Sequence, residues 1–438
     1  MKTLDQDANK NRFLWRCYLQ ILYLVAYVWR RLLFRTTFIA ITGSLGKTTT
    51  KECIAAIFSA HFPTAKTLRN QNDRYGVPRT ILRVRPWHRF AVVEVATNQP
   101  GLMRRSARLV RPHVAVVLTV ARTHTKDFLS LDETAAEKAQ ILKALSPTGL
   151  AILNAEDPRV LKMADGCRCR VKTFGRSAEL DLWADEVSSK WPARLSLRVH
   201  AGSEMQRIKT NLVGLHWVNS VLAALLTALS CGIPLKAAAE ALEQVEPFPA
   251  RMQPVLLPSG ATIIRDEYNS SPPTLEAALR AFEKFEAVRR VLVISGFSDS
   301  PKNSRTRLRE LGKRASEIAD LAVFVNREHG QHAVKAAISS GMKPECVLNF
   351  TDLHEAASYL KSELRIGDLV LLKGRTTDHL PRIFFAQFGS IGCWKTNCSK
   401  TINCDFCDEL RPGFDVESIY KPRTVQASIN PSLSNDLA

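Results

Sequence analysis

The stretch TGSLGKTT (residues 42–49) carries the residue types of a phosphate-binding turn. It follows an apolar, β-branched run and leads into a segment of helical character, so it is expected to join a strand to a helix. Gly43 and Gly46 allow successive backbone N–H groups to point at phosphate oxygens at the positive end of that helix. Lys47 is expected to reach the β- and γ-phosphates of a nucleotide, and the Thr48 hydroxyl to bind magnesium. The standard pattern requires one more glycine, five residues before Gly46, so the motif is incomplete.

Alternating strands and helices are expected to position this turn. Apolar runs of strand length lie at residues 37–42, 90–96, 113–120, 149–154, 262–268, 290–296, 321–326 and 368–374. Their alternation with helical stretches predicts an α/β fold with mainly parallel sheets and helices on both faces. Prolines within residues 246–254 interrupt a helical pattern and mark a domain boundary. The predicted parts are an N-terminal helix (1–37), a central nucleotide-binding domain (38–247), a Rossmann-like C-terminal domain (248–390) and a cysteine-containing tail (391–438) whose end is expected to be disordered.

The N-terminal segment FLWRCYLQILYLVAYVWRRLLF (residues 13–34) is apolar and aromatic but contains Arg16, Arg30 and Arg31. Its uninterrupted apolar part is shorter than the roughly 20 residues of a membrane-spanning helix, and it lacks the cleavage site of a secretory signal. Tryptophan and tyrosine side chains flanked by arginines are typical of a helix that lies in a membrane interface. We therefore predict peripheral association with an anionic membrane surface on its cytoplasmic face. The alternative is a helix that packs on the first domain.

Charge and cysteine usage narrow the choice of partners. A formal net charge of +19 suits nucleic acid, an anionic membrane or polyanionic substrates. The basic residues are spread along the chain without a recognition motif, so nucleic acid is not an expected partner. Ten mostly scattered cysteines indicate a reducing compartment, the cytoplasm. Cys393, Cys398, Cys404 and Cys407 are close enough in sequence to hold zinc, although two of the gaps are longer than in typical zinc sites. The alternative is unrelated cysteines on an exposed tail.

These motifs together resemble the Mur ligase family, the ATP-dependent amide-forming enzymes of peptidoglycan assembly. Besides TGSLGKTT, the resemblance rests on RNQNDRYGVPRTIL (69–82), VVEVATNQPG (92–101), LTVARTHTKDFLSLDETAAEKAQIL (118–142), GLHWVNSVLAA (214–224), EPFPARMQP (246–254), RDEYNSSPP (265–273) and VLLKGR (370–375). It covers residues 38–385. Within the family, the 69–82 stretch is most similar to that of the ligases that add D-alanyl-D-alanine.

The resemblance implies an ATP- and Mg2+-dependent acid–amine ligase of the Mur fold, which forms an acyl phosphate from a carboxylate donor and transfers the acyl group to an amino-acid or dipeptide amine. It places these residues on the nucleotide: Gly43, Ser44, Gly46, Lys47, Thr48, Thr49, Arg251, Asp266 and Asn269. It assigns magnesium to Thr48, Glu94, His124 and Lys138, the last as a carbamate. Lys47, His124 and Lys138 would be catalytic. It assigns substrate contacts to Asn70, Asn72, Lys373 and Arg375. From the residues alone, Glu94 at a strand end is the strongest of these assignments, whereas His124 and Lys138 would be taken for ordinary polar residues.

Departures from the family pattern limit what is implied. The family residues are replaced at Thr119, Leu215, Trp217, Arg265 and Ser271, and Thr376 follows Arg375 in a shifted motif. These changes concern base recognition and acceptor binding, whereas the phosphate loop and the metal ligands are kept. Only about 40 residues precede the loop, where the family has a domain for a UDP-sugar precursor, so a membrane-linked or other carboxylate donor is expected. The alternatives are a non-catalytic ATP-binding relative at the membrane and a nucleic-acid-stimulated NTPase.

Overall fold

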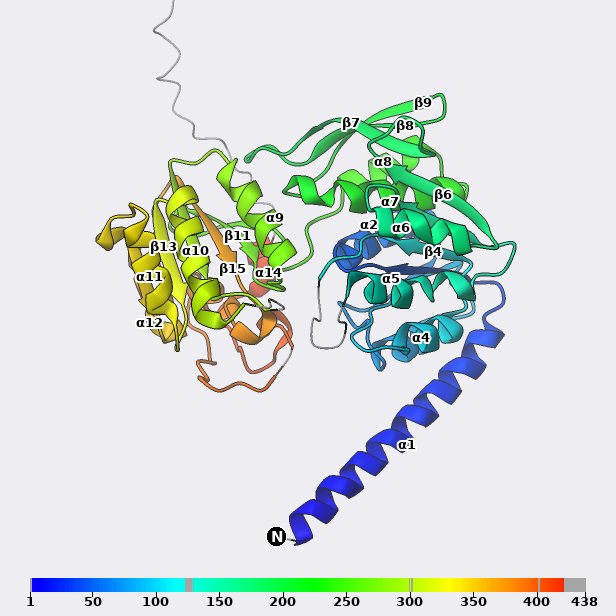
Figure 1. Ribbon diagram of the computed structural model, residues 1–438, viewed down its shortest axis with the longest axis horizontal. Helices are drawn as coiled ribbons and strands as arrows, with labels where there is room; N and C mark the ends of the chain where they lie inside the picture. The colour runs from blue at the N-terminus through cyan, green and yellow to red at the C-terminus, as the bar shows by residue number, and fades with distance from the viewer. Residues whose placement is uncertain are drawn as a thin grey trace, which may run out of the picture. The chain divides into compact units, whose positions relative to one another are not determined.

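Two β-sheets organise the chain, one in each of two units of the computed structural model (Figure 1). The structure describes residues 2–122, 128, 130–298, 300, 302–400 and 402–420. The first unit holds residues 1–253, 269–286 and 297–307, and the second holds residues 254–268, 287–296 and 308–438. His124 lies outside the described residues, and so does the end of the chain, about the last dozen residues, that is predicted to be disordered.

The first unit is built on a nine-stranded sheet of order β2-β3-β1-β4-β5-β6-β7-β8-β9 among the described residues. Its strands are β1 (Thr37–Thr42), β2 (Thr64–Lys66), β3 (Phe90–Glu94), β4 (Val114–Val117), β5 (Leu150–Asn154), β6 (Arg170–Gly175), β7 (Leu182–Ser188), β8 (Ser196–Ala201) and β9 (Glu204–Lys209). The pairs from β2 to β7 are parallel, which confirms the predicted parallel sheet. The antiparallel pairs β7–β8 and β8–β9 were not predicted, because these strands are only partly buried and lack continuous apolar runs.

Nine described α-helices belong to this unit, and α1 contributes to the core around the central strand β1. They are α1 (Lys2–Leu32), α2 (Lys47–Ser59), α3 (Gly76–Arg83), α4 (Leu102–Val110), α5 (Leu131–Ala139), α6 (Pro158–Leu161), α7 (Val218–Ser230), α8 (Leu235–Glu243) and α9 (Pro272–Glu283). Phe38 and Ala40 of β1 belong to one core cluster with Ala26 of α1 and with Leu33, which follows α1. The predicted N-terminal helix is therefore present, and the part next to β1 packs on the domain.

The second unit contains a six-stranded sheet of order β10-β11-β15-β12-β13-β14 among the described residues. Its strands are β10 (Gln253–Leu256), β11 (Thr262–Asp266), β12 (Arg289–Ile294), β13 (Leu321–Val325), β14 (Val347–Phe350) and β15 (Asp368–Lys373). Its helices are α10 (Ser304–Ile318, whose first residues belong to the first unit), α11 (Gly330–Ser339), α12 (Leu353–Glu363), α13 (Pro381–Ala386) and α14 (Val416–Tyr420). The β11–β15, β15–β12, β12–β13 and β13–β14 pairs are parallel, as predicted.

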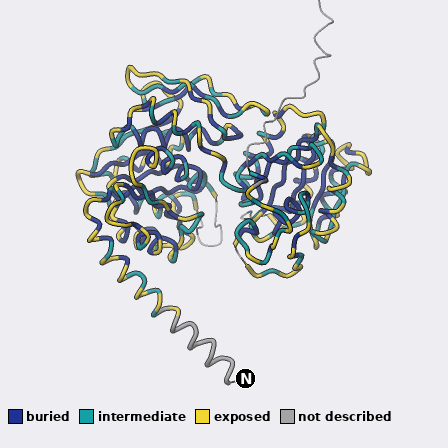
Figure 2. Tube along the Cα trace, turned by 180° about the vertical axis from the view of Figure 1, so that it is seen from behind, coloured by how far each residue is buried: buried dark blue, intermediate teal, exposed yellow. Residues whose placement is uncertain are grey.

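The cysteine-containing segment is part of this second unit. Ile391, Cys404, Leu410 and Ile419 are buried in one core cluster with residues of the central strands. In Figure 2, the buried stretches of the trace lie in the interior of each unit. The interpretation of these cysteines as lying on an exposed tail is therefore wrong for the described part of the segment, which ends at Tyr420.

Candidate active site

The loop between β1 and α2 needs glycine at two positions. Gly43 has a φ of 153° and Gly46 a φ of 80°, both in the left-handed region that other residues rarely adopt. A Cβ on Gly43 would lie 2.9 Å from the Leu118 Cβ, and a Cβ on Gly46 would lie 3.1 Å from the Ser220 Oγ. The loop therefore combines a positive φ with close approach of neighbouring segments, at the carboxyl end of a central parallel strand where ligands bind in open α/β sheets.

The segment after β4 clamps this loop. The backbone N–H of Ser44 donates to the Thr119 carbonyl at 2.8 Å, and that of Leu45 donates to the Thr119 Oγ1 at 3.1 Å. The Ser44 hydroxyl lies 3.0 Å from the Ala121 carbonyl and 2.9 Å from the Ala121 backbone nitrogen. Thr119, which departs from the family pattern, thus supports the loop. Ser44 is hydrogen-bonded within the fold and holds the shape of the loop, and its contact with the nucleotide stays a prediction.

Lys47 begins α2 and folds back over the loop. Its Nζ donates to the carbonyls of Gly43 at 2.7 Å and Ser44 at 3.2 Å. Burial lowers the pKa of Lys47, while the nearby Glu94 opposes that shift and the Arg251 guanidinium adds to it. A cation that is desolvated in this way is stabilised by an anionic ligand. The structure thus brings Lys47 and Arg251 into one electrostatic environment.

Glu94 ends β3, and its carboxylate is the anionic group beside α2. The carboxylate oxygens accept hydrogen bonds from the Thr48 Oγ1 at 3.1 and 3.2 Å and from the Asn72 Nδ2 at 2.6 Å. Glu94 is 1% exposed and lies opposite Ile41 of β1 in the sheet register. The hydroxyl and carboxylate oxygens are the hard ligands that magnesium prefers. Asn72, predicted as a substrate contact, orients the Glu94 carboxylate in this structure, and its contact with substrate stays a prediction.

Lys138 is buried on α5 without a carboxylate to neutralise it. It is 3% exposed, and within the described residues its Nζ makes no hydrogen bond or ion pair. The pKa of Lys138 is lowered to about 7, mainly by burial and also by the like charge of Lys47, against the attraction of Glu137. A buried ammonium beside another ammonium is unfavourable. The site therefore favours a neutral amine, or a derivative that carries negative charge.

Two residues that organise the site were not predicted from the sequence. Glu137 accepts hydrogen bonds from the backbone N–H groups of Gly101 at 2.9 Å and Met103 at 2.8 Å, which fixes α5 to the start of α4. Lys51, one turn after Lys47, is fully buried, and its Nζ donates to the carbonyls of Thr67 (3.1 Å) and Arg69. A lysine and a glutamate on helices carry no motif signal, and their partners are identified only by the fold.

The remaining predicted residues of the first unit lie around the same loop or in connecting segments. Thr49 is buried in the first turn of α2. Asn70 precedes Asn72 in the segment held by Lys51, and its carbonyl accepts from the Asn72 N–H at 2.8 Å. Asn269 lies in the segment before α9. Trp217 is 7% exposed, and its indole N–H finds no acceptor among the described residues.

In the second unit, the predicted residues gather at the carboxyl ends of neighbouring strands. Asp266 of β11 lies opposite Lys373 of β15, and the Lys373 Nζ donates to the Asp266 Oδ2 at 2.5 Å. The Arg375 guanidinium pairs with the Asp378 carboxylate at 2.6 Å. The Asp378 carboxylate also accepts from the Ser295 hydroxyl, just after β12, at 2.5 Å. At this edge of the sheet, the charged side chains therefore form ion pairs with one another.

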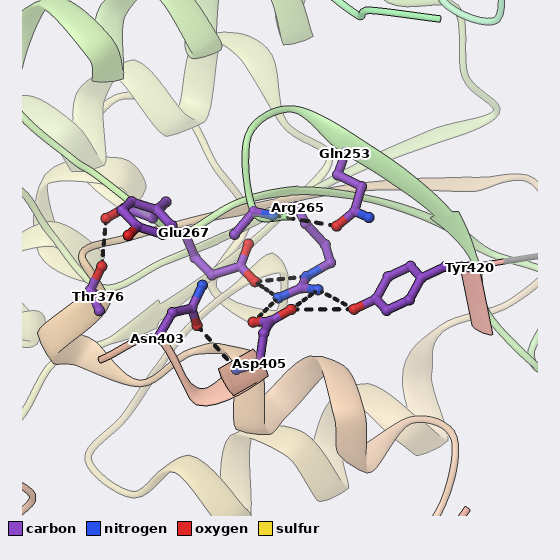
Figure 3. Close-up of polar contacts among 9 residues, drawn as sticks. Gln253, Arg265, Glu267, Thr376, Asn403, Asp405 and Tyr420 are labelled. Carbon is purple, nitrogen blue, oxygen red and sulfur yellow. Dashed lines mark hydrogen bonds and ion pairs between the residues drawn. The ribbon is translucent and has the colours of Figure 1, made fainter. Parts of the chain in front are cut away.

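Arg265 explains one departure from the family pattern (Figure 3). Its fully buried guanidinium contacts the Glu267 carboxylate at 2.5 and 2.8 Å, the Asp405 carboxylate at 2.7 and 2.8 Å, and the Tyr420 hydroxyl at 2.7 Å. It also lies over the Phe384 ring at 4.1 Å. Burial raises the pKa of Glu267 to about 7 despite the opposing Arg265 charge. Arg265 therefore joins the cysteine-containing segment to β11, a structural role in place of a ligand contact.

The four C-terminal cysteines line one small cavity of about 10 Å³ together with His379. The Cys404 Sγ lies 3.4 Å from the His379 Nδ1, and the Lys400 Nζ lies 3.7 Å from the Cys407 Sγ. Burial raises the pKa of the Cys404 thiol to about 11. Across the described ranges, no three histidine, cysteine or acidic side chains form a group that could hold a metal ion. The predicted zinc site is thus not assembled by these side chains as they stand.

Family models match most of the chain. The Mur ligase middle domain matches residues 41–228, and the glutamate ligase domain of Mur ligases matches residues 250–376. Among curated proteins, the chain is 30% identical over 357 residues to a UDP-N-acetylmuramoyl-tripeptide–D-alanyl-D-alanine ligase of Mycobacterium bovis, covering 77% of this chain and 70% of the relative. The corresponding ligase of Bacillus subtilis is 27% identical over 340 residues, covering 77% and 73%.

Solved structures show the same relationship. A crystal structure of MurF from Acinetobacter baumannii has a TM-score of 0.78 and 25% identity, and covers 84% of this chain and 80% of that one. MurF ligase from Thermotoga maritima in complex with ADP has a TM-score of 0.72 and 22% identity, with 84% and 82% covered. The sequence resemblance and the fold therefore lead to the same family.

Proposed function

This chain belongs to the Mur ligase family, an ATP-dependent carbon–nitrogen ligase family, and on that premise we propose that Lys47, Thr48 and Glu94 form the phosphoryl-transfer centre of a ligase. The observation that carries this proposal is the Glu94 carboxylate, held by Thr48 and Asn72 beside the glycine loop at the ends of two adjacent parallel strands. A non-catalytic relative would have no evident need for a buried acidic side chain fixed at this position.

The proposed reaction has two steps. A donor carboxylate oxygen attacks the γ-phosphorus of ATP, the bond to the β–γ bridging oxygen breaks, and ADP leaves. The acceptor amine then attacks the acyl carbon, inorganic phosphate leaves with the oxygen that attacked, and the amine loses a proton. Because two anions meet in the first step, Lys47 and the N–H groups at the start of α2 have to offset their repulsion.

The residues present fit magnesium. The Thr48 hydroxyl and the Glu94 carboxylate are oxygen ligands 3.1–3.2 Å apart on elements that the fold fixes. When bound, magnesium would neutralise the charge that develops on the transferring phosphoryl group. His124, a further proposed ligand, lies outside the described residues.

We also propose that Lys138 is carbamylated. Its Nζ would attack carbon dioxide and lose a proton, giving an anionic carbamate in place of an ammonium. The pKa of Lys138, lowered to about 7, supports this because the free amine is the form that reacts. The product would present a carboxylate close to the Lys47 ammonium and convert an unfavourable neighbour into an ion pair.

The substrates are proposed from the names of the relatives and from the N-terminal segment. The amine would be a dipeptide of the D-alanyl-D-alanine kind, and the donor a peptide carboxylate linked either to a UDP-sugar or to a membrane carrier. Since the reaction consumes ATP, we place the enzyme in the cytoplasm, peripherally on the cytoplasmic face of the membrane. Within the described residues, no helix is both long and apolar enough to cross a bilayer.

ADP release by the full chain with magnesium tests the function. A panel would pair UDP-sugar-linked and lipid-linked peptide carboxylates with single amino acids and dipeptides, and Lys47→Ala would be the blank. We expect turnover that needs both a donor and an amine and that disappears in Lys47→Ala. ADP release that needs neither substrate and rises with DNA or RNA would favour a nucleic-acid-stimulated NTPase. Tight ATP binding without turnover for every pair would favour a non-catalytic relative.

A structural zinc ion is a separate proposal for the second unit. Its support is the shared cavity of Cys393, Cys398, Cys404 and Cys407, which has room for little more than one atom. Thiolates bind zinc tetrahedrally, so the side chains would have to rotate inward. We expect about one zinc per chain in protein purified without chelator, and its loss in Cys404→Ser but not in Cys231→Ser. Metal-free protein with unchanged stability in chelator would contradict the proposal.

A further inference from the structure

The positive charge is concentrated in one quarter of the chain. Residues 13–122 contain 18 lysine and arginine residues and 3 aspartate and glutamate residues, and so carry +15 of the total of +19. The basic residues are spread along the chain, as predicted, but the net charge is not, because acidic residues are scarce in this stretch. The stretch includes most of α1 and all of α3 and α4. Such an excess attracts a polyanionic surface.

The helix α1 is fixed to the first unit by one face. The Arg30 Nε donates to the Val110 carbonyl at 2.6 Å, and its Nη2 donates to the Arg111 carbonyl at 2.8 Å. The Trp29 indole N–H donates to the Val84 carbonyl at 2.9 Å. These bonds hold the C-terminal part of α1 against α4 and the end of α3, so the orientation of the helix on this unit is defined.

The opposite face of α1 is apolar and uncovered in the described structure. The large apolar side chains of α1 that are 40–63% exposed are Trp15, Tyr18, Ile21, Leu24, Val25, Tyr27, Val28 and Leu32. Tyr18, Ile21, Val25, Val28 and Leu32 recur with helical spacing and form one stripe. Figure 2 shows this helix as partly exposed along its described length. A continuous apolar stripe exposed on a surface marks a site of interaction.

A basic groove lies beside the stripe. Its volume is about 630 Å³, and it is lined by Tyr23 and Tyr27 of α1 and by Arg104, Arg105 and Arg108 of α4, with no acidic side chain in the lining. The Arg105 guanidinium lies 3.8 Å from the centre of the Tyr23 ring. Among the described residues, none of the three arginines has a carboxylate partner. The groove is thus suited to a phosphate-bearing head group next to hydrocarbon.

We propose that the apolar stripe of α1 and this arginine groove together bind an anionic lipid bilayer, with α1 lying in the head-group layer and the groove holding lipid phosphates. The combination of an apolar helix face with flanking arginines is that of an interfacial helix. Aliphatic side chains such as Val25 and Val28 have no counterpart in a phosphodiester backbone, so the stripe favours a membrane over nucleic acid. This surface is distinct from the glycine loop and does not depend on the ligase reaction.

Vesicle sedimentation of the full chain tests the proposal. The vesicles are phosphatidylcholine alone or phosphatidylcholine with 30% phosphatidylglycerol. We expect binding only to the anionic vesicles, weakened by 0.5 M salt. Exchange of Arg104, Arg105 and Arg108 for glutamine should lower the partition coefficient about 100-fold. The matched control replaces three exposed cations near or on β6 by glutamine, and it should bind as the wild type does. These cations are Lys162, Arg168 and Arg170.

A second variant tests what the apolar stripe contributes to vesicle binding, apart from the arginine groove. Val25→Asp with Val28→Asp leaves the arginines in place and should lower binding at least 10-fold while circular dichroism stays unchanged. Equal binding of neutral and anionic vesicles, or equal losses in the groove variant and the β6 control, would overturn the proposal. So would duplex DNA that binds through the same arginines while the aspartate variant binds vesicles as wild type does. ADP release measured on the same samples reports the ligase separately.

Discussion

Replacement of Lys138 by methionine should stabilise the protein in carbon-dioxide-free buffer. Methionine keeps the length of the side chain and removes a charge that the fold disfavours. The pKa of Lys138 is lowered to about 7 in the folded state from an ordinary 10.5, so the folded protein binds the proton less well than the unfolded chain does. A lowered lysine pKa destabilises the fold wherever the unfolded chain is protonated, which is below pH 10.5. The penalty is largest below pH 7 and falls as the pH rises towards 10.5.

The size of the effect follows from the size of the shift. Lys138 is almost fully buried, so solvent screening reduces the shift little. The penalty is about 4 kcal/mol at pH 7 and about 2 kcal/mol at pH 9, an average slope of roughly 1 kcal/mol per pH unit. Lys138→Met should therefore exceed the unmodified wild type in free energy of unfolding by these amounts. Lys143→Met, an exposed lysine nearby, is the matched control and should show no such slope.

Urea denaturation of both variants and wild type between pH 7 and pH 9 measures these differences. In bicarbonate the wild type should gain stability relative to Lys138→Met, because the carbamate removes the buried cation, and mass spectrometry under native conditions should show an added 44 Da. A difference between wild type and Lys138→Met that does not change with pH would refute the burial argument. A pH-dependent difference that ignores bicarbonate would refute the carbamate alone.

Three further substitutions test other parts of the structure. Glu94→Gln should lower ADP formation at least about 100-fold at fixed magnesium, because a charged ligand is lost while the fold is kept. Steady-state assays over a magnesium series should show partial recovery at higher magnesium. No response to magnesium would contradict the ligand role of Glu94. Asp405→Ala should lower the free energy of unfolding by about 3 kcal/mol or more, because Arg265 then keeps one carboxylate partner in a buried site. In the same urea titration, replacement of the exposed Asp408 by alanine should cost under about 0.5 kcal/mol. Equal costs would contradict the structural role of the Arg265–Asp405 ion pair. If the buried indole N–H of Trp217 donates to the nucleotide, Trp217→Phe should raise the KM for ATP about 5- to 10-fold and leave kcat unchanged. An unchanged KM would contradict that contact.

The sequence predicts the parts of the site that depend on short-range patterns. The glycine loop, its position between β1 and α2, and Glu94 at the end of β3 all follow from strand-length apolar runs and their boundaries. Such arrangements are predictable since ligands bind where parallel strands end. The adjacency of Thr48 and Glu94 was implied only by the family resemblance, and the structure accounts for it because β1 and β3 are neighbours in the parallel sheet.

Residues whose role depends on distant partners were not predictable. Arg265 and Asp405 are 140 positions apart in sequence, and the Arg265 substitution looked like a lost ligand residue until the fold supplied its partners. Glu137 likewise bonds to backbone groups more than 30 positions away. The antiparallel strands β8 and β9 and the uncovered stripe of α1 depend on which faces the fold leaves exposed, and local sequence does not determine that.

Transfer of an oxygen isotope from donor to phosphate tests the central claim most directly. The donor carboxylate would be labelled with ¹⁸O on both oxygens, and phosphate and product would be analysed by mass spectrometry after a single turnover. The proposed acyl phosphate predicts one labelled oxygen in the inorganic phosphate and one in the new amide, with no label in either from Lys47→Ala. Unlabelled phosphate released together with ADP would mean that water attacks the γ-phosphorus, and would contradict ligation through an acyl phosphate.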